Sequence, residues 1–112
     1  MQNRKLGRTA DHRKAVLRNL STEVILKGEI ETTEGKAKEV QSVVDGLITT
    51  AKKETLAARR KAASYLFLDE AVKKLFAEVA PKYKDRKGGY TTVIKTGVRK
   101  GDGAPLAIVK LV

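Results

Sequence analysis

The hydrophobic pattern of this chain changes from helical to strand-like spacing after Pro81. Before that proline, apolar residues recur every three or four positions, which is typical of amphipathic helices. After it, two runs rich in β-branched residues, 90–98 and 106–112, flank the turn-forming segment 99–104. This arrangement predicts a C-terminal β-hairpin. Because a hairpin alone is marginally stable in water, we expect it to pack on the helices.

Capping signals divide the part before the hairpin into separate elements. Thr9 is a suitable N-cap for a first helix, and Gly28 suits the position just after its end. Thr33 precedes a second apolar stripe of about 18 residues, and Pro81 is expected to stop the last helix. The expected elements are helices over 9–27, 34–51, 57–65 and 69–80 and a short strand over 29–33, which is available to pair with the hairpin.

These elements predict an α+β fold, with three to four helices packed on a small sheet that contains the C-terminal hairpin. At 112 residues the chain is long enough for a single domain. We expect that domain to comprise a flexible basic arm (1–8), a mainly helical part (9–80), and a basic loop with the hairpin (82–112).

Composition excludes several functional classes. The chain has no cysteine, which rules out a disulfide scaffold, a thiol nucleophile and cysteine-based zinc sites. No apolar run approaches the roughly 20 residues of a membrane span, and the N-terminal residues do not form a secretory signal, so we expect a cytoplasmic protein. His12 is the only histidine and has no partner acid other than the adjacent Asp11. We therefore expect no catalysis, no metal or other cofactor, and no small-molecule substrate.

Positive charge is concentrated near the two ends of the sequence. The chain contains 24 Lys and Arg against 13 Asp and Glu, a formal net charge of +11. Residues 1–18 hold six basic residues and one acidic residue, residues 82–100 hold seven and one, and residues 19–81 hold ten of each. Such a basic domain usually binds a polyanion. We expect the two cationic segments to meet in one binding surface.

Three groups of cations are candidate phosphate contacts. The first joins the arm to the first helix, where arginine forks and free helix N–H groups both suit phosphate. The second is the loop 82–90, whose tyrosines have the shape to stack on a base, although edge packing explains Tyr90 equally well. The third is the hairpin tip. Helix-surface charge explains the remaining pair, at 59–60, about as well as binding does. The full candidate set is Arg4, Lys5, Arg8, His12, Arg13, Lys14, Arg18, Arg59, Arg60, Lys84, Arg86, Lys87, Arg99 and Lys100.

Several short motifs occur in a fixed order along the chain. They are Arg4-Lys-Leu-Gly-Arg8, His12-Arg13…Leu17-Arg-Asn19, Thr32-Thr33…Lys36-Ala-Lys-Glu39, Leu47-Ile-Thr49, Arg59-Arg60, Lys74-Leu-Phe76, Arg86…Gly88-Gly-Tyr-Thr91 and Arg99…Gly101-Asp102. In this order the motifs resemble the bacterial large-subunit ribosomal protein seventeen family, over essentially the whole chain.

The resemblance implies a non-enzymatic structural protein of translation. Its members bind large-subunit ribosomal RNA on the outer surface of the ribosome, near the tunnel exit and beside neighbouring large-subunit ribosomal proteins. Two positions depart from the family pattern: Thr92 replaces a usual arginine, and Lys110 replaces a usual acidic residue. The segment 60–70 is also short for the family, so we expect a trimmed loop there.

From the residues alone, the alternative is an architectural DNA-binding protein. Such proteins commonly insert apolar wedges into the minor groove. The sequence offers no obvious exposed wedge and no recognisable recognition helix. RNA is therefore the favoured polyanion, bound mainly through backbone phosphates.

Overall fold

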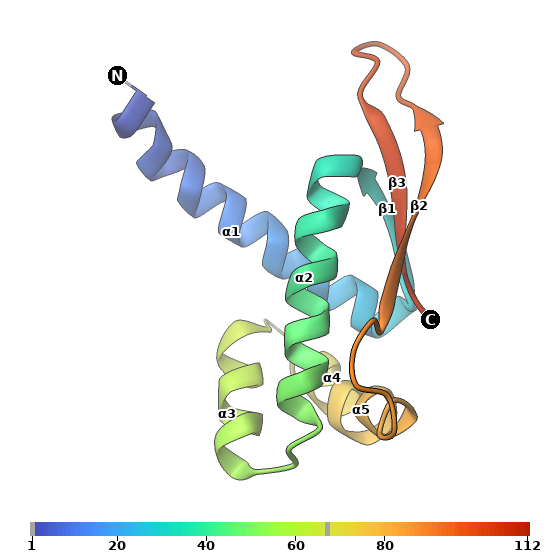
Figure 1. Cartoon of the computed structure of the whole chain (residues 1–112). Coiled ribbons are helices and arrows are strands. Elements are labelled where there is room, and N and C mark those ends of the chain that lie inside the picture. Colours follow the sequence, from blue (N-terminus) through green and yellow to red (C-terminus); the bar gives the residue numbers. More distant parts are fainter. Residues whose placement is uncertain (1, 67) are drawn as a thin grey trace.

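The helices of the protein gather on one side of a three-stranded sheet, and α2 lies against that sheet (Figure 1). The computed structural model describes the backbone of residues 2–66 and 68–112 and the side chains of residues 11–66 and 68–112. This architecture confirms the predicted α+β class. The elements in chain order are α1 (Gln2–Lys27), β1 (Glu29–Thr33), α2 (Glu34–Ala51), α3 (Leu56–Tyr65), α4 (Asp69–Lys74), η1 (Leu75–Val79), α5 (Ala80–Lys82), β2 (Thr91–Val98) and β3 (Pro105–Leu111).

Helix α1 ends where the sequence predicts but begins earlier. Gly28 has a φ of +90°, and its N–H donates to the Val24 carbonyl at 2.8 Å, so a glycine closes the helix as expected. The helix starts at Gln2 rather than near Thr9. Gly7 does not end it, because a single glycine costs only about 1 kcal/mol relative to alanine. The side chains of residues 1–10 lie outside the described residues, and the basic arm over 1–8 stays a prediction.

The helical stretch that begins at Asp69 continues past the expected stop at Pro81. It widens into a π-turn at η1, where the Ala80 N–H donates to the Leu75 carbonyl five residues earlier. Pro81 then falls in the first turn of α5, where the missing N–H of proline is tolerated. The stop at Pro81 was therefore wrong, and the helical stretch ends at Lys82.

Strand β3 lies in the middle of the sheet and pairs antiparallel with both β1 and β2. Val109 of β3 stands opposite Ile30 on one side and opposite Val93 on the other. A bulge between Lys95 and Gly97 shifts the β2 register near the hairpin tip. The strand predicted at 29–33 thus joins the hairpin, as expected.

The core fills the space between α2 and the sheet. Val40, Val44 and Ile48 repeat at helical spacing along α2 and are fully buried. Ile25 of α1 and Val109 of β3 are buried in the same cluster. Because the apolar faces of the helices and the inner face of the sheet pack together here, the charged segments remain on the outside of the molecule.

Candidate nucleic-acid interface

The basic residues 12–14 of α1 differ in whether they form an ion pair with an acidic side chain. His12 and Lys14 are exposed. Arg13 is also exposed but forms a two-pronged ion pair with Glu39 of α2, in which its Nε donates to Oε2 at 3.4 Å. Arg13 therefore links α1 to α2, and of these three residues it is the least available to a phosphate.

Arg18 is held by an aromatic neighbour. Its guanidinium lies over the ring of Tyr65 of α3, 5.3 Å from the ring centre, and the residue is half-buried. Burial raises the pKa of Tyr65, while the positive charge of Arg18 acts in the opposite direction. The predicted phosphate contact at Arg18 would therefore use a side chain that already joins α1 to α3.

Helix α3 presents a second group of cations. The Thr55 hydroxyl caps the helix by accepting from the Ala58 N–H at 3.0 Å. Arg59 lies over the ring of Phe76, 5.2 Å from its centre, and remains exposed. Arg60 is exposed as well and forms no ion pair within the described residues. Arg60 is thus better placed than Arg59 to take a phosphate.

The tyrosines of the loop after α5 belong to the core. Tyr83 and Tyr90 are 3% and 1% exposed, and their ring centres lie 5.3 Å apart. The interpretation that they stack on a base is therefore wrong, because their apolar faces are buried against each other and the core.

A small polar network fixes the same loop. The Tyr90 hydroxyl donates to the Arg86 carbonyl at 3.1 Å and accepts from Lys52 Nζ at 3.0 Å. Lys52 also donates to the Arg86 carbonyl, and its hydrogen bond lowers the pKa of Tyr90. This anchoring keeps Lys84, Arg86 and Lys87 exposed on the outside of the loop.

The hairpin tip holds its arginine with an internal acid. Arg99 binds Asp102 through two contacts, Nε to Oδ1 at 3.1 Å and a terminal nitrogen to Oδ2 at 2.5 Å. Oδ1 also accepts from the Ala104 N–H at 3.1 Å, and together these contacts hold the pKa of Asp102 at about 2. Lys100 is exposed and forms no ion pair in the described part of the chain.

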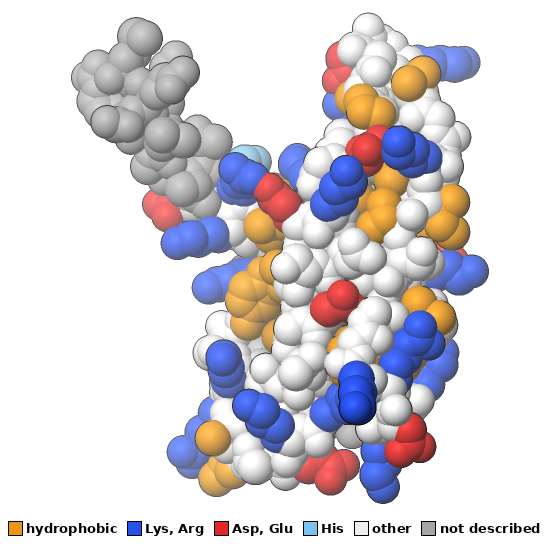
Figure 2. All heavy atoms as spheres, viewed as in Figure 1, with side chains coloured by type: hydrophobic (Ala, Val, Ile, Leu, Met, Phe, Trp, Pro, Cys, Tyr) orange, Lys and Arg blue, Asp and Glu red, His pale blue; other side chains and the backbone are white. Residues whose placement is uncertain are grey.

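The cationic groups lie at two ends of the molecule. Figure 1 places the hairpin tip at the same end as the start of α1, and the loop after α5 at the opposite end. Strand β2 separates tip from loop with eight residues, which at strand rise span about 26 Å. The expectation of one common surface is therefore wrong for Lys84, Arg86 and Lys87. Figure 2 likewise shows Lys and Arg side chains over both ends.

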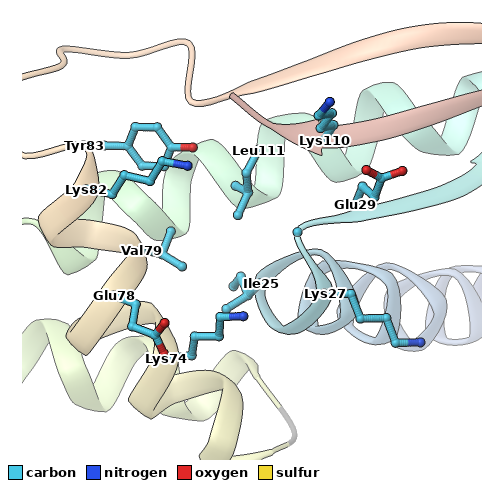
Figure 3. A pocket seen from close by; sticks show the side chains of 11 residues that line it. Ile25, Lys27, Glu29, Lys74, Glu78, Val79, Lys82, Tyr83, Lys110 and Leu111 are labelled. Atoms are coloured by element: carbon cyan, nitrogen blue, oxygen red, sulfur yellow. The ribbon is translucent and has the colours of Figure 1, made fainter.

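The sequence did not predict a lysine-lined groove between the end of α1 and the end of β3 (Figure 3). The groove measures about 340 Å³. One of its lysines, Lys74, donates to the Leu26 carbonyl at 2.7 Å, and another, Lys82, lies over the Tyr83 ring. The lysines of the groove come from four separate elements, so no local sequence signal could have found it.

Together, the fold and the surface define a small basic α+β domain that presents cations at two ends. Among the described residues no cluster of acidic, histidine or cysteine side chains could hold a metal ion. No described helix has both the length and the apolar character needed to cross a membrane.

Comparison with known proteins then gives the family. Residues 16–112 match the family Ribosomal protein L17. The chain is 56% identical over 109 residues to large ribosomal subunit protein bL17 of Thermoanaerobacter sp. (strain X514), covering 97% of each chain. It is 50% identical over 112 residues to the bL17 protein of Moorella thermoacetica, covering 100% of each. The chain belongs to the ribosomal protein L17 family. This confirms the resemblance in the sequence and identifies a structural protein rather than an enzyme.

Proposed function

We propose that this protein is a structural constituent of the large ribosomal subunit in the bacterial cytoplasm. It binds large-subunit ribosomal RNA through backbone phosphates and stabilises the folded RNA near the tunnel exit, beside neighbouring large-subunit proteins. The relatives named large ribosomal subunit protein bL17 support the assignment to the subunit. The contacts with RNA are supported by this chain's own surface.

The observation that carries RNA binding is a set of exposed cations that form no ion pair with the acidic residues the structure describes. The ion pairs of the described residues engage Arg13, Lys27, Lys38, Lys95 and Arg99. Seven of the candidate lysines and arginines are exposed and stand outside that set. They are Lys14, Arg59, Arg60, Lys84, Arg86, Lys87 and Lys100. A cation that is not neutralised within the chain is available to a phosphate, and it releases a counterion when it binds one.

The two-ended layout indicates how the RNA is recognised. Phosphate contacts fix position and orientation but do not read sequence. Cations at both ends require the RNA to approach from more than one side, so selectivity comes from the shape of the folded RNA. An isolated DNA duplex is straight, so its phosphates contact fewer of these cations at the same time.

The proposal is tested by the salt dependence of binding to protein-free large-subunit RNA. If about six to eight phosphates are engaged, log K falls against log salt with a slope of roughly −4 to −7. Duplex DNA of random sequence serves as the competitor. A slope near zero, or equal competition by the DNA, would contradict the proposal.

Membership of the subunit is tested separately in cells. Tagged protein is sedimented through a sucrose gradient, and we expect it to travel with the large subunit. A hydroxyl-radical probe tethered at Lys100 then reports which RNA lies beside the hairpin tip. Cleavage remote from the tunnel-exit RNA would contradict the proposed location.

A further inference from the structure

The sheet has one face that no described helix covers. Side chains alternate along a strand, and the buried Ala107 and Val109 of β3 point toward the helices. Leu106 and Ile108 therefore point away from them. Ile94 of β2 stands opposite Ile108 and is 48% exposed. Figure 1 shows all the helices on the other side of the sheet. An apolar strip thus runs across the outer face.

Strand β1 adds an open backbone edge to this face. The Leu111 N–H donates to the Gly28 carbonyl at 2.9 Å. Because hydrogen-bonded pairs alternate along an antiparallel ladder, Ile30 bonds to β3, whereas Glu29 and Glu31 turn their backbone groups outward. Within the described residues, no other hydrogen bond reaches those outward groups.

The opposite edge of the sheet is less open. The Val112 N–H donates to the Tyr90 carbonyl at 2.9 Å, so the same alternation turns the backbone groups of Thr91 outward on β2. Gln41 of α2 donates to the Thr91 carbonyl at 3.1 Å and covers that end. Lys95 further along β2 places a charge on the same edge.

The outer face also differs in charge from the rest of the molecule. Glu29 and Glu31 are exposed there and form no ion pair in the described part of the chain. Glu31 accepts a hydrogen bond from the Thr96 hydroxyl, at 2.8 Å. Lys110 lies beside Glu29 on the neighbouring strand (Figure 3). The face therefore has one more acid than base, on a chain of net charge +11.

We propose that this outer face docks a basic segment of another protein of the large subunit. The apolar strip of Ile94, Leu106 and Ile108 packs against apolar side chains of that segment. Lysines or arginines of the segment pair with Glu29 and Glu31, and the open edge of β1 supplies backbone hydrogen bonds. The inference rests on the proposed function, because the subunit is where the partner is sought.

Other occupants fit this surface less well. RNA phosphates would meet two carboxylates and an apolar strip, with Lys110 as the single cation of the three charged residues on this face. A second copy of this chain would bring another +11 charge and an equally acidic β1 edge. Edge carboxylates also deter strand pairing with copies of the same protein. With a basic partner, the same carboxylates instead form ion pairs with the lysines or arginines of that partner.

The test uses photo-crosslinking in assembled large subunits. Ile94 is replaced by benzoylphenylalanine, and purified subunits carrying the variant are irradiated. Mass spectrometry identifies the crosslinked molecule. We expect a lysine- or arginine-rich peptide of another subunit protein. The same photoprobe at Lys100 serves as a control that crosslinks RNA. If the Ile94 variant does not sediment with the subunit, the photoprobe at Thr92, on the same face, is used in its place.

Charge reversal decides whether the two carboxylates contribute. We expect the double variant Glu29→Lys and Glu31→Lys to reduce the protein crosslink about tenfold, which corresponds to the loss of two exposed ion pairs. The matched control Glu54→Lys and Glu70→Lys adds the same charge on the helical part and leaves the yield unchanged. Crosslinks to RNA, to a second copy or to nothing, or a yield insensitive to the reversal, overturn the inference. Failure of the wild-type chain to sediment with the subunit instead overturns the proposed function.

Discussion

The hairpin tip allows one substitution to raise RNA affinity without adding a cation. Arg99 is held by Asp102 through contacts of 3.1 and 2.5 Å, and both side chains are exposed. The substitution Asp102→Asn removes the negative charge that competes with phosphate for Arg99. The asparagine oxygen can still accept from the Ala104 N–H, so the turn is expected to keep its shape.

The size of the gain follows from counterion release. Each additional phosphate contact makes the slope of log K against log salt more negative by about 0.7 to 0.9. A released Arg99 that takes one phosphate therefore raises affinity roughly five- to eightfold at 0.1 M salt, and about two- to threefold at 0.3 M. We expect no change in thermal stability beyond a degree or two, because exposed ion pairs contribute little.

Mild acid cannot reproduce the effect of this substitution. The pKa of Asp102 is lowered from 3.8 to about 2. A lowered pKa means that the ion pair is fully present above the ordinary value and is lost only as pH falls toward about 2. Between pH 5 and 8 the carboxylate stays ionised, so Arg99 of the wild-type protein stays held across that range.

Fluorescence anisotropy with protein-free large-subunit RNA, at four or more salt concentrations, measures both the slope and the affinity. The control Glu70→Gln makes the same change in net charge on an exposed helix surface that holds no cation in an ion pair. It tests whether overall charge alone explains the gain. Equal slopes for the wild type and Asp102→Asn, or an equal gain for Glu70→Gln, would refute the reasoning.

Three further predictions concern the arm, the core and the loop after α5. Replacing Arg4, Lys5 and Arg8 together by glutamine weakens RNA binding in the same anisotropy assay but lowers the melting temperature by no more than a degree or two; a large drop would place the arm in the core. Ile48→Ala removes a fully buried side chain of α2, and urea unfolding should show a loss of about 2 to 5 kcal/mol; a loss below 1 kcal/mol would contradict that burial. Tyr90→Phe removes the hydroxyl that anchors the preceding loop. It should lower the free energy of unfolding by about 1 kcal/mol in the same urea assay and speed amide hydrogen exchange in that loop. Unchanged exchange would show that the hydroxyl does not anchor the loop.

Local patterns predicted the elements well where each depended on a few neighbouring residues. The bounds of β1 and α2 match the expected 29–33 and 34–51. The glycine that closes α1 was likewise predictable, because a positive φ at C′ is a property of that one residue. The continuation past Pro81 was not, since it depends on a π-turn that shifts the backbone hydrogen bonds before the proline.

The candidate site was predictable as a set of residues but not as a surface. Arg13 and Arg99 carry the same charge in the sequence as Lys14 and Lys100. Only the structure shows that the first two are held by acids, one of them 26 residues away on another helix. The burial of Tyr90 was equally undetermined, because a tyrosine beside a strand can pack inward or outward.

The sequence by itself determined the α+β class, the excess of positive charge and the membership of a family, because periodicity, composition and motif order are properties of the linear chain. Tertiary structure alone decided which cations remain free, that they lie at two ends of the molecule, and that one sheet face carries an apolar strip with an acidic edge. Charge pairing and burial depend on distances between residues remote in sequence, and those distances are set only when the helices pack on the sheet.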